Sequence, residues 1–274
     1  MSFKHIIIQF SLGALLLACT SNKNNDEETL AETTETTKAI EEQKINAQNV
    51  FNSIPGPSEL SELVSQTGLD YDISLTNDPM NLNKYTSDDA KALNLGVYGG
   101  DMVYANVYEQ TQESMSFLKC LNVLCRNLGI TNSFDDKTAD RLQANKENKD
   151  SLLTIVSQSF NKADQFLRDN QRRGTSALMV AGGWIEGLYI SAKVAEKSKN
   201  KRMVQKMSQQ KKSLSDLIEL VESGKVGGVA YVLDGLKDLK LSYDKIADGA
   251  TMSDEVFTEI NTKVSALRAK LVAV

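Results

Sequence analysis

The segment Thr175–Lys199 constrains the fold most strongly, because it is highly apolar and yet rich in glycine. Its centre, residues 178–189, reads LMVAGGWIEGLY and contains the chain's only tryptophan. At helical spacing Leu178, Ile185 and Leu188 share an ordinary core stripe, whereas Gly183, Gly187 and Ser191 form a stripe without large side chains. Each glycine inside a helix costs roughly 1 kcal/mol relative to alanine. We therefore expect a central helix whose glycines are compensated by close packing against another backbone.

A second helix offers a matching surface. The helix expected over residues 87–108 begins at Ser87 and carries Ala92, Gly96 and Gly100 at the same spacing. Two helices with matching stripes of small residues are natural partners in a close crossing. A large side chain at Gly183 is accordingly expected to block that crossing.

The rest of the chain predicts an all-α fold, because period-two alternation is nowhere sustained. Residues 70–86 are expected to form an irregular polar loop. Residues 38–274 are therefore predicted to form one bundle-like domain of about eight to ten helices. The predicted helices are 38–53, 58–68, 87–108, 110–129, 135–145, 151–170, 175–199, 224–241 and 253–272.

The N-terminus has the pattern of a secretion signal. Lys4 precedes an apolar run from Ile6 to Leu17, which is too short to span a bilayer. The run ends in Leu16-Leu17-Ala18-Cys19, which resembles the lipobox of bacterial lipoproteins. That resemblance implies that residues 1–18 are a lipoprotein signal peptide and that Cys19 is lipidated and anchors the chain to a membrane. The alternative is an ordinary signal peptide with a chance cysteine.

Residues 19–37 are expected to be a flexible tether between the anchor and the domain. They are rich in Thr, Asn and Glu and lack aromatic side chains, so they cannot bury enough apolar surface to offset the entropy of ordering. The cluster Asp26-Glu27-Glu28 resembles the export signal of surface-exposed lipoproteins in the Bacteroidota, and Thr20 is not the aspartate that retains enteric lipoproteins at the inner membrane. An outer-membrane location is expected, with the periplasmic face and the cell surface both left open.

Composition excludes several functions. After removal of the signal, 30 basic residues remain against 36 acidic ones, which argues against a nucleic-acid-binding protein. The single histidine, His5, lies in the signal, so the mature chain has no histidine for a nucleophile system or a zinc site. Cys120 and Cys125 lie five residues apart on one predicted helix, where they point in different directions and are expected to be buried thiols. No metal and no cofactor are predicted.

Two carboxylates interrupt apolar helices beside glycine pairs, and they are the candidate functional groups. These are Asp101 and Glu186. Their aromatic neighbours in sequence are Tyr98, Tyr104, Tyr108, Trp184 and Tyr189. Carboxylates beside aromatic faces suit the binding of a sugar, a peptide or a cation. Alternatively, each acid is a structural group paired with a tyrosine hydroxyl or with an arginine such as Arg168 or Arg172.

The lipobox and two apolar segments, residues 93–108 and 182–189, together resemble an uncharacterised all-helical lipoprotein family of the Bacteroidota. The resemblance brings no activity, and it implies no functional residue other than Cys19. Three functions are left open. The first is a non-catalytic interaction or assembly module that binds an envelope protein; the second is a small-ligand-binding protein; the third, least favoured, is a hydrolase that uses carboxylates without histidine.

Overall fold

The computed structural model of the chain describes residues 50, 62–64, 66–131, 133–145 and 148–273. The expected signal peptide of residues 1–18, Cys19 and the tether of residues 19–37 lie outside these ranges. Of the helix expected over residues 38–53, only Val50 is described, and it is buried.

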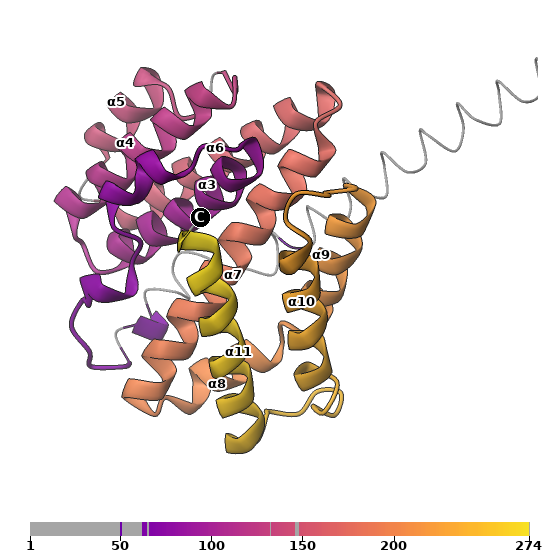
Figure 1. The fold of residues 1–274 in the computed structure, drawn as a ribbon. Helices are drawn as coiled ribbons and strands as arrows, with labels where there is room; N and C mark the ends of the chain where they lie inside the picture. Colours follow the sequence, from indigo (N-terminus) through magenta and orange to yellow (C-terminus); the bar gives the residue numbers. More distant parts are fainter. Residues whose placement is uncertain (1–49, 51–61, 65, 132, 146–147, 274) are drawn as a thin grey trace, which may run out of the picture. The chain divides into compact units, whose positions relative to one another are not determined.

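The described part of the chain is all-α, as predicted, and it contains helices and no strand. Nine α-helices and two 3-10 helices are found there (Figure 1). The 3-10 helices are η1 (Ile73–Leu75) and η2 (Pro79–Lys84). The α-helices are α3 (Asp88–Val107), α4 (Thr111–Asn127), α5 (Asp136–Ala144), α6 (Lys149–Asp169), α7 (Arg173–Ser198), α8 (Lys201–Ser208), α9 (Lys211–Ser223), α10 (Ala230–Tyr243) and α11 (Asp254–Ala273).

Helix boundaries follow the capping residues. The Ser87 hydroxyl accepts a hydrogen bond from the backbone N–H of Ala90 and so begins α3, as expected. The loop of residues 70–86 is more regular than predicted, because the side chains of Asp72 and Asp78 cap the short helices η1 and η2. The helix expected from residue 224 instead begins at Ala230, since Gly227 lies outside any helix and Gly228 lies in the turn that precedes α10.

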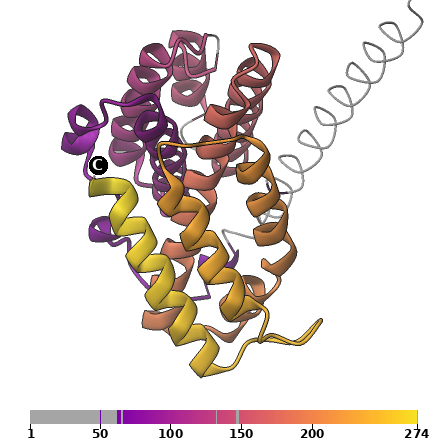
Figure 2. The same cartoon turned by 45° about the vertical axis from the view of Figure 1, so that its right-hand side comes forward.

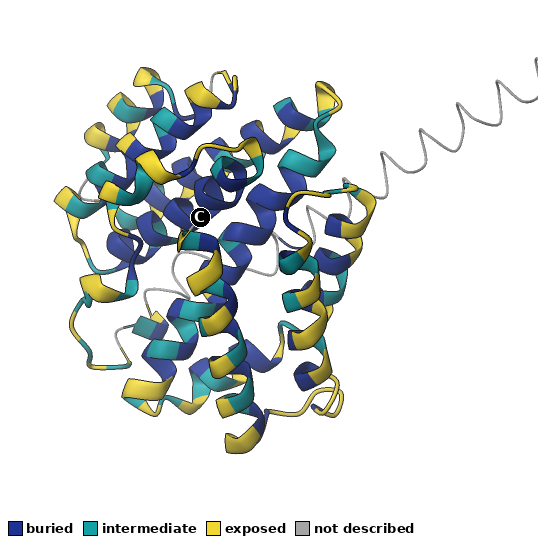
Figure 3. Cartoon of the chain, in the orientation of Figure 1, coloured by how far each residue is buried: buried dark blue, intermediate teal, exposed yellow. Residues whose placement is uncertain are grey.

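Helix α7 is the central element, as the sequence predicts. It packs against α3, α6, α8, α9 and α11, and its contact with α3 is the most extensive between any two helices described (Figure 1). Helices α9, α10 and α11 lie side by side along one side of α7 (Figure 2). Burial is concentrated along α3 and α7 (Figure 3). Both helices are apolar around most of their circumference because neighbours cover them on several sides.

The crossing of α3 and α7 is a backbone-to-backbone contact. A Cβ atom on Gly96 would overlap the carbonyl oxygen of Met179, and a Cβ atom on Gly182 would overlap that of Leu93. The predicted partnership is therefore present, with Gly96 of α3 in the contact as expected, since a Cβ atom there would also lie 2.4 Å from the Gly183 nitrogen. A Cβ atom on Gly183 would lie 3.5 Å from the Gly96 oxygen, an ordinary contact, and Gly187 has open space around it. The glycine of α7 whose missing side chain matters most is therefore Gly182, which the expected stripe did not include.

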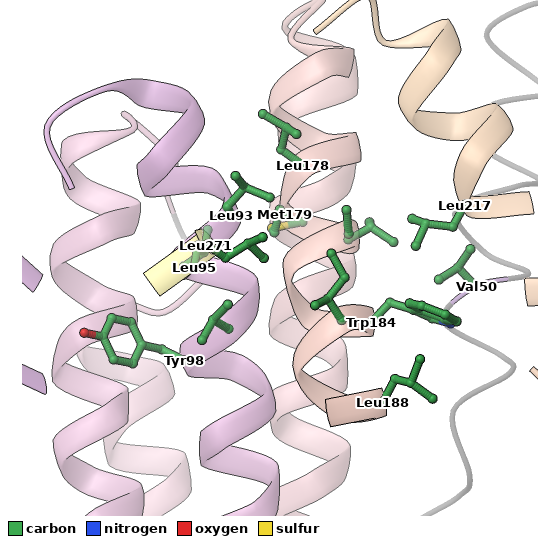
Figure 4. Packing of buried hydrophobic residues seen from close by; sticks show 14 of the residues in the cluster. Val50, Leu93, Leu95, Tyr98, Leu178, Met179, Trp184, Leu188, Leu217 and Leu271 are labelled. Carbon is green, nitrogen blue, oxygen red and sulfur yellow. The ribbon is translucent and has the colours of Figure 1, made fainter. Parts of the chain in front are cut away.

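Side chains close the core on both sides of α7. Leu93 and Leu95 of α3 face Met179, whereas Trp184 points the opposite way, toward Val50 and Leu217 (Figure 4). Cys120 and Cys125 are free, buried thiols, in agreement with the structural role expected for them.

Two glycine-to-alanine variants test this packing. Gly96→Ala should lower the free energy of unfolding by about 3 kcal/mol, because the added methyl group forces the two backbones apart. Gly187→Ala, the matched control on the open side of α7, should be neutral or stabilise by up to about 1 kcal/mol through helix propensity. Urea denaturation followed by circular dichroism measures both. Equal effects of the two substitutions would contradict the close crossing.

Candidate functional site

The close crossing brings the two candidate carboxylates together, so we call Asp101 of α3 and Glu186 of α7 the acid pair. Both residues are completely buried, with 0% of their surface exposed. Room for Glu186 comes from Gly100, since a Cβ atom there would lie 3.1 Å from both Cβ and Cγ of Glu186. The small residues on α3 thus serve two purposes. Gly96 admits the backbone of α7, and Gly100 admits the side chain of Glu186.

The positive partner of the acid pair is Arg268 of α11. Its Nε and Nη2 atoms donate to both carboxylate oxygens of Glu186 at 3.0–3.3 Å. The guanidinium carbon lies 4.8 Å from the centre of the Tyr189 ring, a cation–π contact. Sequence reasoning missed Arg268, although a signal was present: it stands at helical spacing between Val264 and Leu271, two buried residues of α11.

A loop covers the acid pair from the other side. We call residues 69–78 the cover loop. The backbone N–H of Asn77 donates to Oδ2 of Asp101 at 3.1 Å, and Nη2 of Arg268 donates to the carbonyl oxygen of Leu75 at 3.4 Å. The Asn77 side chain donates to the Tyr85 hydroxyl at 2.8 Å and to Oδ1 of Asn94 at 3.3 Å. The acid pair therefore connects α3, α7, α11 and the cover loop.

Hydrogen-bond accounting places a proton on the acid pair. No N–H or hydroxyl of the described residues reaches Oδ1 of Asp101, although that atom is buried. A buried carboxylate oxygen without a donor is costly, and two buried carboxyl groups share a single guanidinium, so a proton on one of the two carboxyls lowers that cost. Glu186 already accepts from Arg268, so the proton belongs to Asp101. One buried guanidinium then balances one buried carboxylate, which is the arrangement of lowest desolvation cost.

The electrostatics agree with this assignment. Burial raises the pKa of Asp101 well above its ordinary value, and the negative charge of Glu186 raises it further. Burial also raises the pKa of Glu186, but the Arg268 guanidinium opposes that effect. Both effects favour a proton on Asp101 and a negative charge on Glu186.

The sequence left open that each acid is a structural group paired with a tyrosine or an arginine. An arginine does pair with Glu186, but it is Arg268 and neither Arg168 nor Arg172. Arg168 pairs with Asp164, and Arg172 donates to the carbonyl oxygen of Leu128.

The candidate aromatic residues separate into three places. Tyr189 lies beside the acid pair through its contact with Arg268. Tyr98 is core, packed between Tyr85 and Phe117, with its hydroxyl donating to the carbonyl oxygen of Asp78. On the other side of α7, Trp184 donates from Nε1 to the hydroxyl of Ser213 at 3.0 Å. Tyr104 and Tyr108 lie elsewhere, in a surface cleft.

This surface cleft lies between α3, α7 and the cover loop, and we call it the α3–α7 cleft. Its volume is about 370 Å³. Tyr104 and Tyr108 pack edge to face, with ring centroids 5.1 Å apart, and both pack against Tyr71. The lining residues are Leu69, Asp70, Asp72 and Leu75 of the cover loop, Tyr104 and Tyr108 of the α3 end, and Lys193, Val194, Glu196 and Lys197 of α7. An apolar and aromatic floor with charged groups of both signs at its rim suits a binding site.

Comparison of the chain with protein-family models, with curated proteins and with solved structures finds no match. Over the described ranges, no group of three or more His, Cys, Asp or Glu side chains is placed to hold a metal ion. None of the helices in those ranges combines the length and hydropathy of a membrane-spanning helix.

Substitutions in the acid pair distinguish its two members. Asp101→Asn should fold and be at least as stable as the wild type at neutral pH, because the amide reproduces a protonated carboxyl without the proton uptake that wild-type folding requires there: its oxygen accepts from Asn77 and its NH₂ donates to Glu186. Glu186→Gln should destabilise by about 3 kcal/mol, because it leaves the buried Arg268 without its counter-charge. Thermal unfolding compares the two variants, and equal losses would refute the asymmetric proton.

The same variants give a pH test. Folding raises the pKa of Asp101 above its unfolded value of about 4, so its stabilisation is complete below that value and is lost as pH rises toward the folded pKa. The loss is at most about 1.4 kcal/mol per pH unit. Asp101→Asn has no proton to lose, so its stability relative to wild type should increase with pH. A constant difference across the pH range would contradict the assignment.

Proposed function

We propose that this chain is a lipid-anchored protein of the cell envelope whose helical domain is a non-catalytic interaction or assembly module. In this proposal Cys19 holds the mature chain at a membrane, most simply the outer membrane, and residues 19–37 give the domain reach. The domain then binds a partner protein of the envelope at the α3–α7 cleft. In this proposal the signal peptide and the lipobox direct the chain to the envelope and provide its membrane anchor. The helical domain provides the binding surface.

The observation that carries the non-catalytic part is the enclosure of the acid pair. Both carboxyl groups have 0% exposure. Glu186 is ion-paired with Arg268, and Asp101 accepts a hydrogen bond from Asn77 of the cover loop. A glycosidase-type mechanism needs two carboxyl groups that face a substrate and a water molecule. Because Asp101 and Glu186 face each other and the protein interior, a hydrolase built on them is disfavoured.

The choice of a protein partner follows from the wall of the cleft. Ile73 stands between two lining residues of the cover loop and leaves 56% of its surface exposed. An exposed large apolar side chain beside a partly apolar cleft is typical of a protein–protein contact. The rim carries Asp70 and Glu196 as well as Lys193 and Lys197, which suits a mixed-charge protein surface better than a nucleic acid.

A small ligand is the second candidate function. The cleft volume of about 370 Å³ lies at the lower end of the range of small-molecule sites, and tyrosine rings at its floor suit a sugar or a peptide side chain. Native mass spectrometry of protein purified from its own envelope separates the two: a mass excess of small-molecule size that Tyr108→Ala removes supports the ligand, whereas its absence disfavours it.

Lipidation is tested by metabolic labelling. Cells producing the full chain and fed tritiated palmitate should yield a labelled protein that fractionates with membranes. Cys19→Ser should be unlabelled, because the modified thiol is missing. Label that persists in Cys19→Ser, or a wild-type chain without label, would exclude the anchor.

Partner binding at the cleft is tested by site-specific photo-cross-linking in intact cells. Benzoylphenylalanine at Ile73, which lies in the cover loop between the lining residues Asp72 and Leu75, should give one discrete adduct, because that side chain is 56% exposed beside the proposed contact. The matched control is Leu241 of α10, which is similarly exposed at 63% but belongs to a helix that contributes no lining residue to the cleft. Identical adducts from both positions, or no adduct from Ile73, would contradict the proposed surface.

A further inference from the structure

The cover loop is both the wall of the cleft and the lid of the acid pair. Leu69, Asp70, Asp72 and Leu75 line the cleft, and two residues farther along the chain Asn77 donates its backbone N–H to Asp101. A displacement of this short segment therefore changes the cleft and the surroundings of the acid pair together.

Six polar contacts hold the cover loop on the helices, and two of them are made by the Asn77 side chain to Asn94 and by the Tyr98 hydroxyl to the carbonyl oxygen of Asp78. Two more involve the acid-pair network: Asn77 N–H to Oδ2 of Asp101 at 3.1 Å, and Arg268 to the carbonyl oxygen of Leu75 at 3.4 Å. The other two involve Asp72, whose N–H donates to the Tyr104 hydroxyl at 3.1 Å and whose carboxylate lies 3.7 Å from Nζ of Lys197. Because the Lys197 side chain is 63% exposed, its ion pair contributes little, and the buried contacts dominate.

We propose that the proton shared by Asp101 and Glu186 keeps the cover loop closed, and that loss of this proton releases the loop and opens the α3–α7 cleft. The consequence for binding rests on the proposed function of that cleft, whereas the movement of the loop does not. In the closed state the Asp101 carboxyl donates its proton to Glu186 and accepts from Asn77. When the proton leaves to water, two buried carboxylates face one guanidinium, and the excess negative charge is relieved only when Asp101 reaches solvent.

Every other charged or titratable group near Asp101 keeps its state between mildly acidic and mildly alkaline pH. Burial raises the pKa of the Cys120 thiol of α4 to about 11, and burial also raises the pKa values of the neighbouring tyrosines, so all of these groups stay neutral. Arg268 stays charged because Glu186 raises its pKa. The tyrosines concerned are Tyr71, Tyr85, Tyr98 and Tyr189. None of these groups therefore competes with the acid pair as the source of a pH effect on the cover loop.

Hydrogen exchange of the full chain tests the proposal without a partner. Amide exchange in peptides covering residues 69–78 is measured from about pH 6 to about pH 9 and corrected for the intrinsic rate. If opening releases the proton, the opening constant of the wild-type loop should rise by up to about tenfold per pH unit. Peptides from α9, which packs against α7 and α10, supply the internal reference.

Two variants make the outcome specific. Asp101→Asn keeps the bond to Asn77 and has no proton to lose, so its loop exchange should be independent of pH. Tyr104→Phe removes only the hydroxyl that accepts from Asp72, so exchange should be faster at every pH while the wild-type slope remains. A wild-type loop without pH dependence, or an Asp101→Asn loop with the wild-type slope, would overturn the proposal. Either failure leaves the cross-linking result at Ile73 unaffected, so the two proposals fail separately.

Discussion

The absence of side chains at Gly96 and Gly182 lets the backbones of α3 and α7 touch, and the rest of the domain is arranged around that contact. The two helices become the interior of the described domain, covered by their neighbours. The same proximity places the Glu186 side chain against Gly100, directly beside Asp101. Burying two carboxyl groups side by side has a high desolvation cost. The contact between α3 and α7 supplies no positive charge that would offset this cost.

The acid pair in turn explains why distant parts of the chain meet. Arg268 of α11 supplies the only full positive charge hydrogen-bonded to the pair among the described residues, and Asn77 supplies a backbone donor from the cover loop. Asn94 extends the network by donating to the carbonyl oxygens of Ala90 and Leu271, which fastens the end of α11 to α3. Buried polar networks specify one arrangement of helices because every alternative leaves a polar atom unsatisfied. Here the network fixes the position of the C-terminal helix and of the loop.

Local signals in the sequence were sufficient for most of the helices and insufficient for the site. Ser87 and the stripe of Leu178, Ile185 and Leu188 predicted the start of one helix and the core face of another, because capping and amphipathic periodicity are short-range effects. Asp101 and Glu186 stood out in the sequence because their neighbours are apolar. Their partners Arg268 and Asn77 lie far away in the chain, and the spacing of residues within one helix does not predict which distant residue packs against it. Trp184 shows the converse error: it is close to Glu186 in sequence, yet it faces the opposite side of α7.

The shared proton is the central claim of this account, and infrared spectroscopy observes it directly. A buried, protonated carboxyl group has a C=O stretching band that an ionised carboxylate lacks. We expect this band in the wild-type protein at neutral pH, and we expect it to be absent from Asp101→Asn and to disappear from the wild type as the pH is raised. A wild-type spectrum without the band at neutral pH, or a band that persists unchanged in Asp101→Asn, would show that Asp101 does not carry the proton.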